Sequence, residues 1–279
     1  MTQASSSPSL CLIIGDPVAH SLSPKMHNAA YREMNINYVM GAARVTEGSL
    51  PDALRGVRAL NIRGLACTMP HKVSICPLLD GLDPVARAIG AVNTVVREND
   101  KLIGFNTDWL GILRPLESKI SLRDKRVAVL GAGGAALAAV YACISAEATV
   151  TIFNRTISKA IPLAKRFDIE VAPLSDSCDL ARFDVIINTT SVGMSPNTSE
   201  SPLTATQIRS HHVIFETIYY PHQTQLLRLA TSNGATVLRG LDMFLEQGAA
   251  QFELHTGVKA PRETMRNEIS PPLVTYRSI

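Results

Sequence analysis

The sequence predicts an α/β protein of two domains, with helices covering parallel sheets. Short apolar runs alternate along the chain with stretches of helical period, the pattern of strand–helix–strand units. One of these runs leads directly into a glycine-rich turn and an Ala-rich helix. The 279 residues, 46% of them hydrophobic and 18% charged, are ample for packed cores.

The first part of the chain contains three expected elements. Residues 10–14 are expected to form a strand that ends at Gly15-Asp16-Pro17. A helix is expected to begin after Ser23-Pro24, with Ser23 as its cap and the proline in its first turn. Residues 65–69 are expected to form a second short strand that Pro70 closes.

The composition shifts near Asp124, where a second series of elements begins. The strands expected there leave room for crossover helices and cover residues 126–130, 148–153, 183–188, 212–215 and 236–238. A last helix is expected from Gly240 onward. We therefore predict a substrate-binding first domain over residues 1–113 and a nucleotide-binding domain over 114–239. Residues 240–279 are expected to fold back and complete the first domain.

Several classes of protein are excluded by composition. A net charge of +3 without a Lys/Arg block argues against nucleic-acid binding. The polar start lacks a signal-peptide pattern, and no apolar run reaches the ~20 residues that span a bilayer. Five scattered cysteines without CxxC indicate reduced thiols, and His20, His27 and His71 lack metal-ligand spacing. We expect a cytoplasmic protein without a metal site.

The glycine-rich turn predicts a Rossmann-type, doubly wound domain that binds a dinucleotide. Gly131, Gly133 and Ala136 fit the G-x-G-x-x-A pattern between a strand and a helix. The first glycine permits the tight turn, the second lets a pyrophosphate approach the backbone, and the helix N-terminus supplies free N–H groups. The residues expected at the cofactor are Gly131, Ala132, Gly133, Gly134, Ala135, Asn154, Arg155, Thr156 and Gly240.

The end of the next strand favours NADP over NAD. An NAD site usually places Asp or Glu there for the ribose 2′-hydroxyl, whereas this chain has Asn154-Arg155-Thr156. Arg155 can bind a 2′-phosphate with its planar fork, and the neutral Asn154 does not repel it. An arginine at a solvated strand end is the alternative interpretation.

Strings along nearly the whole chain resemble the shikimate dehydrogenase family, in the family's order. They are GDPVAHSLSP at 15–24, MHN at 26–28, TMPHK at 68–72, AIGAVNT at 88–94, GFNTD at 104–108, the glycine turn, NRT at 154–156, NTTSVGM at 188–194, YYP at 219–221 and the segment 240–247.

The resemblance implies that Lys72 and Asp108 carry the acid/base chemistry. Hydride transfer between an alcohol and NADP also moves a proton at the alcohol oxygen, and a positioned acid or base speeds such a step by about 10²–10⁴-fold. Which of the two groups carries the proton is left open. Taken without the family, each would be a surface charge.

The resemblance also implies the residues that hold the substrate, a hydroxylated ring with a carboxylate. Ser21 and Ser23 are expected to bind the carboxylate, although both could instead cap the following helix. Further contacts to the ring are expected from Thr68, Asn93, Gln247 and Tyr219.

The activity that the resemblance implies is reversible NADPH-dependent reduction of 3-dehydroshikimate to shikimate, in aromatic amino-acid biosynthesis. The protein is expected to be a monomer or homodimer. Departures from the family pattern at Ala66, Trp109, Leu137 and Glu216-Thr217 leave open quinate or an amino-substituted analogue as substrate, and NAD as cofactor. A non-catalytic, NADP-binding regulatory protein is the alternative of another class.

Overall fold

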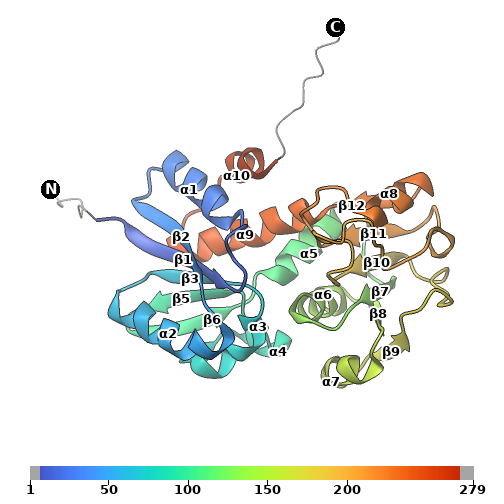
Figure 1. The fold of residues 1–279 in the computed structure, drawn as a ribbon, viewed down its shortest axis with the longest axis horizontal. Coiled ribbons are helices and arrows are strands. Elements are labelled where there is room, and N and C mark those ends of the chain that lie inside the picture. Colours follow the sequence, from blue (N-terminus) through green and yellow to red (C-terminus); the bar gives the residue numbers. More distant parts are fainter. Residues whose placement is uncertain (1–6, 271–279) are drawn as a thin grey trace, which may run out of the picture.

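A computed structural model describes residues 7–270, which form two six-stranded sheets with helices packed around them (Figure 1). The sheet order is β2-β1-β3-β5-β6-β4 in the first part of the chain and β12-β11-β10-β7-β8-β9 in the second. The α/β class predicted from the sequence is confirmed.

The first sheet is mixed rather than parallel. Its strands are β1 (Ser9–Gly15), β2 (Tyr38–Arg44), β3 (Gly64–Cys67), β4 (Gly81–Leu82), β5 (Thr94–Glu98) and β6 (Lys101–Phe105). The β5–β6 pair is an antiparallel hairpin, and β5 also runs antiparallel to β3. The helices of this part are α1 (Ser23–Glu33), α2 (Leu50–Ala59), α3 (His71–Ser74) and α4 (Pro84–Ile89), with short 3₁₀ turns at Glu47–Ser49 and Cys76–Leu78.

The second sheet is parallel throughout. Its strands are β7 (Arg126–Leu130), β8 (Thr149–Asn154), β9 (Glu170–Pro173), β10 (Val185–Asn188), β11 (Val213–Glu216) and β12 (Thr236–Leu238). Its helices are α6 (Gly134–Ser145), α7 (Ile157–Phe167) and α8 (Gln225–Ser232), with a 3₁₀ turn at Ala205–Gln207. Counted from β7, the order is 3-2-1-4-5-6, that of the Rossmann fold, and it reverses between β7 and β10.

Two helices lie between the sheets, α5 (Asp108–Glu117) and α9 (Gly240–Thr256) (Figure 1). They cross closely, because a Cβ at Gly111 of α5 would lie 2.7 Å from the carbonyl oxygen of Met243 in α9. Phe252 of α9 packs in the same buried cluster as Met26 and Tyr31 of α1, and α10 (Arg262–Ile269) covers α1. The C-terminal helices thus pack on the first sheet, while the limits predicted for the two domains stay a prediction.

Candidate active site

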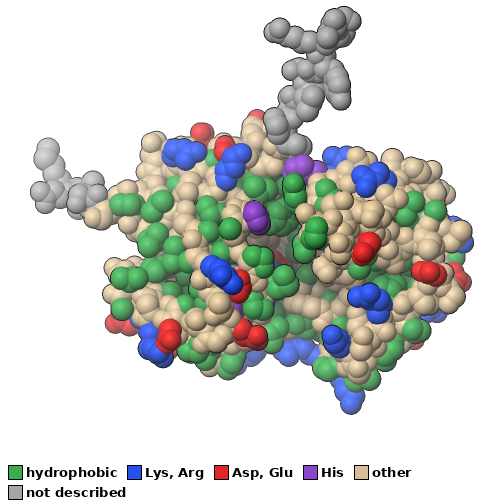
Figure 2. Space-filling view, in the orientation of Figure 1, with side chains coloured by type: hydrophobic (Ala, Val, Ile, Leu, Met, Phe, Trp, Pro, Cys, Tyr) green, Lys and Arg blue, Asp and Glu red, His purple; other side chains and the backbone are tan. Residues whose placement is uncertain are grey.

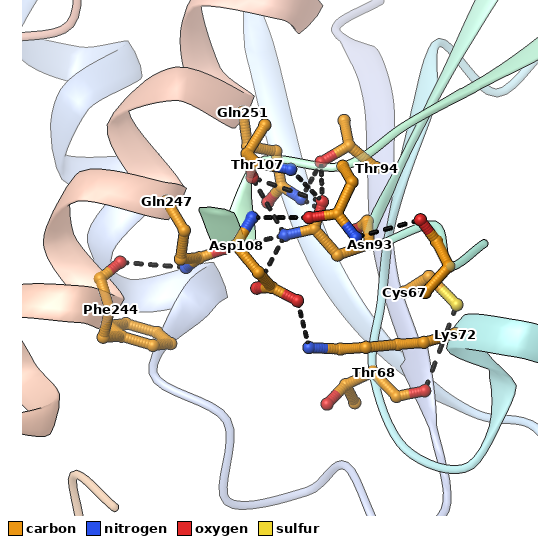
Figure 3. A network of polar contacts seen from close by, with 12 residues as sticks. Cys67, Thr68, Lys72, Asn93, Thr94, Thr107, Asp108, Phe244, Gln247 and Gln251 are labelled. Carbon is orange, nitrogen blue, oxygen red and sulfur yellow. Dashed lines mark hydrogen bonds and ion pairs between the residues drawn. The ribbon is translucent and has the colours of Figure 1, made fainter. Parts of the chain in front are cut away.

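Lys72 and Asp108 form an ion pair, with 2.6 Å between Nζ and Oδ2 (Figure 3). Lys72 lies on α3, and Asp108 is the first residue of α5. The aspartate side chain is only 4% exposed, whereas that of the lysine is 21% exposed. One charge is therefore buried and the other can reach a bound molecule.

The first sheet brings these side chains together because three chain segments enter or leave its strands at the same end of the sheet. Asn93 directly precedes β5, and Thr107 and Asp108 follow β6, its hairpin partner, where Thr94 faces Phe105. The segment after β3 reaches the same end of the sheet, since the Cys67 N–H donates to the Asn93 carbonyl at 2.7 Å.

The Asn93 side chain orients Asp108 and the residue before it through hydrogen bonds. Its Nδ2 donates to Asp108 Oδ1 and to Thr107 Oγ1, each at 2.9 Å, and its Oδ1 accepts the Thr107 N–H at 2.7 Å. Both carboxylate oxygens of Asp108 are thus occupied, one by the amide and one by Lys72. The carboxylate also lies in the first turn of α5, where the helix dipole favours a negative charge.

Helix α9 supplies two glutamines, one turn apart. Gln247 Oε1 accepts from Asn93 Nδ2 at 3.4 Å. Gln251, 2% exposed, donates to the Asn93 carbonyl at 3.1 Å and to Thr94 Oγ1 at 2.9 Å. Neither Thr107 nor Gln251 was predicted from the sequence as a site residue. The four-residue spacing of the glutamines was the available signal, because it places both on one face of a helix.

Thr68 lies beside Lys72 (Figure 3), and its methyl group covers Gly15 at the end of β1, where an added Cβ would be 2.4 Å away.

Ser21 and Ser23 are close to each other, but Ser23 does not cap α1 as predicted. Ser23 is the first residue of α1 rather than its cap, and its N–H donates to Ser21 Oγ at 3.2 Å. Within residues 7–270, no hydrogen bond joins either serine to the network around Asn93.

Tyr219 is half-buried and packs against Phe244 of α9, with ring centroids 4.8 Å apart. Burial raises the pKa of its phenol, and the charge of Lys72 opposes that shift, so the hydroxyl is within electrostatic range of the ammonium. The second half of the molecule thus contributes an aromatic side chain close to the ion pair.

The glycine turn faces this network from the second half. Gly131 has φ +109°, and a Cβ there would lie 2.8 Å from Thr189 Oγ1, so both conformation and space require glycine. Gly133 has open space around it and precedes α6 without a side-chain cap. A Cβ at Gly134 would lie 3.4 Å from the Lys72 Cδ, so the lysine stem rests against this turn.

These residues fit a dinucleotide. The uncapped N–H groups at Gly133–Ala135 are free to bind a pyrophosphate. Asn154 Nδ2 donates to the Thr156 carbonyl at 2.7 Å and shapes the turn after β8. Arg155 is exposed, and its guanidinium has no hydrogen-bond or ion-pair partner in the described part of the chain. Lys159, also exposed, lies in the first turn of α7 and brings a second cation.

Two other residues brace this side of the site. Gly240 lets α9 start against the loop after β11, since a Cβ there would lie 2.3 Å from the Ile218 carbonyl oxygen. Glu216, fully buried at the end of β11, accepts from Asn188 Nδ2 at 2.9 Å, the Ile218 N–H at 3.1 Å and the Thr224 hydroxyl at 2.9 Å. Burial raises the pKa of Glu216 to about 7, against the effect of these donors.

The remaining features add no reactive group. Trp109 packs edge-on against Tyr141 of α6, with centroids 5.6 Å apart. An open groove of about 780 Å³ lies away from the ion pair, where Arg114 and Arg266 are already paired with Glu246 and Asp242. Among residues 7–270, no cluster of His, Cys, Asp and Glu could hold a metal ion, and no helix has the length and hydropathy needed to cross a bilayer.

The space-filling view shows the molecule hollowed between the two halves (Figure 2). A Rossmann sheet with a dinucleotide turn, opposed across the halves by a lysine–carboxylate pair, defines the class of the protein as a nicotinamide-dependent oxidoreductase.

Comparison with known proteins places the chain within this class. Three family models match, described as shikimate dehydrogenase substrate binding domain (residues 13–95), shikimate / quinate 5-dehydrogenase (115–216) and shikimate 5′-dehydrogenase C-terminal domain (240–269). The shikimate dehydrogenase (NADP(+)) of Shouchella clausii is 41% identical over 264 residues, covering 92% of this chain and 96% of the relative.

Solved structures agree. A shikimate dehydrogenase crystallised with NADP+ superposes with a TM-score of 0.90 at 39% identity, covering 94% of each chain. That of Thermus thermophilus, in complex with NADP(H) and shikimate, has a TM-score of 0.87 at 35% identity and covers 94% of this chain and 98% of its own. The chain belongs to the shikimate dehydrogenase family, as its motifs predicted.

Proposed function

We propose that this protein catalyses the reversible NADPH-dependent reduction of 3-dehydroshikimate to shikimate. The observation that carries the proposal is the Lys72–Asp108 pair, held by Asn93 while the lysine stem rests on Gly134 of the dinucleotide turn. Relatives named for NADP and shikimate support the choice of cofactor and substrate.

Each residue has a distinct part in this mechanism. The turn Gly131–Ala135 would hold NADPH, whose chemistry when bound would be the supply of a hydride for the ring carbonyl carbon. Lys72 donates a proton to the carbonyl oxygen as that oxygen becomes a hydroxyl, and Asp108 orients the ammonium and accepts a hydrogen bond from the ring. In the reverse direction, the neutral amine of Lys72 takes the hydroxyl proton.

The substrate is held around this pair. Asn93, Gln247 and Thr68 offer amide and hydroxyl partners to the ring hydroxyls, and Tyr219 closes the site from the second half. Ser21, in the segment before α1, and Ser23, the first residue of α1, bind the ring carboxylate. A cytoplasmic location and a monomer or homodimer remain predictions.

The cofactor contacts follow from the same geometry. The turn Gly131–Ala135 binds the pyrophosphate, and Arg155, with Lys159 beside it, binds the 2′-phosphate. Arg155→Ala should therefore cut the preference for NADP over NAD by about ten- to a hundredfold, the worth of one charge-assisted hydrogen bond. Lys165→Ala, in the last turn of α7, is the matched control and should leave the preference unchanged.

The direct test is a panel of steady-state rates with shikimate and quinate, each with NADP and NAD. The proposal expects the highest kcat/KM for shikimate with NADP. A preference for NAD above about tenfold would refute the role of Arg155. Higher efficiency with quinate would move the substrate assignment to that ring, and no turnover of any hydroxylated ring acid would favour the non-catalytic regulatory protein.

A further inference from the structure

Arg166 reaches from the second half of the molecule to the first. It lies in the last turn of α7, beside the Rossmann sheet. Its Nε donates to the Ala88 carbonyl at 2.8 Å, and its Nη2 donates to the Arg87 carbonyl at 2.6 Å. Both acceptors lie at the end of α4, in the part that carries Lys72 and Asp108. One side chain therefore bonds the two halves directly.

The end of α4 is shaped to accept this guanidinium. The last carbonyls of a helix have no partner within it and carry partial negative charge, which a cation stabilises. The helix is closed by Gly90 in the left-handed region, with φ +77°. A Cβ at Gly90 would lie 2.6 Å from the Arg166 Cζ, so the glycine also provides the space that the guanidinium occupies.

The segment held by Arg166 leads straight into the active site. Beyond Gly90, the Ala91 carbonyl accepts from Asn106 Nδ2 at 2.9 Å, and the Val92 N–H donates to the Lys72 carbonyl at 2.7 Å. The next residue is Asn93, which holds Asp108. Ala88, which Arg166 binds, is thus four residues before Val92, which contacts Lys72, and five before Asn93, which contacts Asp108.

Helix α7, which carries Arg166, lies on the opposite side of the space between the sheets from α5 and α9. These two helices join the halves at one end of the space between the sheets, whereas α4 and α7 meet at the other end (Figure 1). A rotation of the halves about α5 and α9 would separate α4 from α7 and break both bonds of Arg166. These bonds therefore oppose such a rotation.

We propose that Arg166 is a positioning residue for the reaction. It holds the halves at the separation in which the Lys72 stem rests on Gly134, so that the proton donor and the bound cofactor face one ring. This inference rests on the proposed function for its kinetic consequence only, because the contact and the separation of the halves are independent of turnover.

Arg166→Ala should raise the KM for both shikimate and NADP, since both lie between the halves. The fall in kcat/KM should be about three- to tenfold, the effect of losing two exposed bonds from a charged group. Arg166→Lys should recover part of the loss, because one ammonium cannot replace the planar fork on two carbonyls. Lys165→Ala is the matched control, an exposed neighbour with no partner in the described residues, and should resemble the wild type.

A double-mutant cycle tests whether Arg166 acts through the end of α4. Gly90→Ala alone displaces the guanidinium, so Arg166→Ala should cost little more in the Gly90→Ala background. Additive losses would overturn the coupling. Thermal unfolding of all variants checks that the fold is retained, and Arg166→Ala, which alters an exposed side chain, should keep the wild-type midpoint.

Small-angle X-ray scattering of the ligand-free proteins tests the separation itself. The Arg166→Ala protein should show a larger radius of gyration than the wild type and Lys165→Ala, and saturating NADP with shikimate should reduce the difference. Equal scattering together with equal kinetics would overturn the proposal, as would a Lys165→Ala protein that matched Arg166→Ala. A wild-type protein without turnover would refute the proposed function, whereas the scattering comparison would still decide the role of Arg166.

Discussion

Replacing Lys72 by methionine removes the proton donor while keeping the stem that packs on Gly134. The loss of a positioned acid should lower kcat by about 10²–10⁴-fold, or about 3–5 kcal/mol in the barrier. Asp108, 4% exposed, then loses the ammonium at 2.6 Å and retains Asn93 as partner. Breaking a buried ion pair costs about 3–5 kcal/mol of stability, and the 21% exposure of Lys72 places this case near 2–3 kcal/mol.

The assay combines steady-state rates at saturating shikimate and NADP with urea unfolding. Asp108→Asn is the partner variant, and the double variant closes the cycle. If both groups act on one hydroxyl, the double variant should be no slower than the slower single variant, because residues that act as a unit are not additive. A Lys72→Met enzyme within about tenfold of the wild-type kcat would refute the acid/base role, whatever its stability.

Two further predictions concern the dinucleotide turn and the buried histidines. Gly131→Ala should destabilise the fold by about 1–3 kcal/mol and weaken NADP binding. The φ of +109° and the Thr189 hydroxyl, 2.8 Å from the added Cβ, both oppose a side chain at this position. Urea unfolding and titration with NADP measure the two effects. Burial lowers the pKa of His27 to about 3 and of His255 to about 4 from 6.5, so the unfolded chain binds protons that the folded chain excludes. The free energy of unfolding should therefore fall by about 2 kcal/mol for each histidine between pH 7 and pH 5, as urea titrations would show, and His255→Phe should remove its share of the slope.

The strands of the Rossmann sheet were predictable where they carry a short apolar or β-branched run, which is buried in β7 and partly exposed in the edge strand β12. Residues 126–130 and 236–238 were predicted with the bounds observed for β7 and β12. Strand β9 was missed because it lies at the sheet edge and has no fully buried residue, so it lacks the apolar run by which the other strands are recognised. Its pairing with β8 depends on tertiary context that a single segment does not encode.

The active site depends on a part of the fold that the strand pattern did not reveal. The β5–β6 hairpin, with Asn99 at φ +54° in its turn, was not predicted, although the motifs at both of its ends were. Lys72 and Asp108 are 36 positions apart, and nothing in that spacing states whether they meet. Resemblance to the family supplied the pairing, while the physical cause, three segments leaving one edge of a mixed sheet, required the register of β3, β5 and β6.

The polar face of α9 was predictable from the spacing of its residues in the sequence. Gln247, Gln251 and His255 recur every four residues on a helix whose other neighbours are largely buried, and each bonds to the segment from Asn93 to Val95. A single polar residue on a helix is easily assigned to solvent, but three at this spacing define a stripe that must find partners if the helix is covered. Side-chain and carbonyl groups at the start of β5 satisfy that demand. The helix that returns from the Rossmann sheet is therefore held to β5 by polar contacts. The same contacts orient the amide that holds Asp108, so the packing of the C-terminal helix also positions the active site.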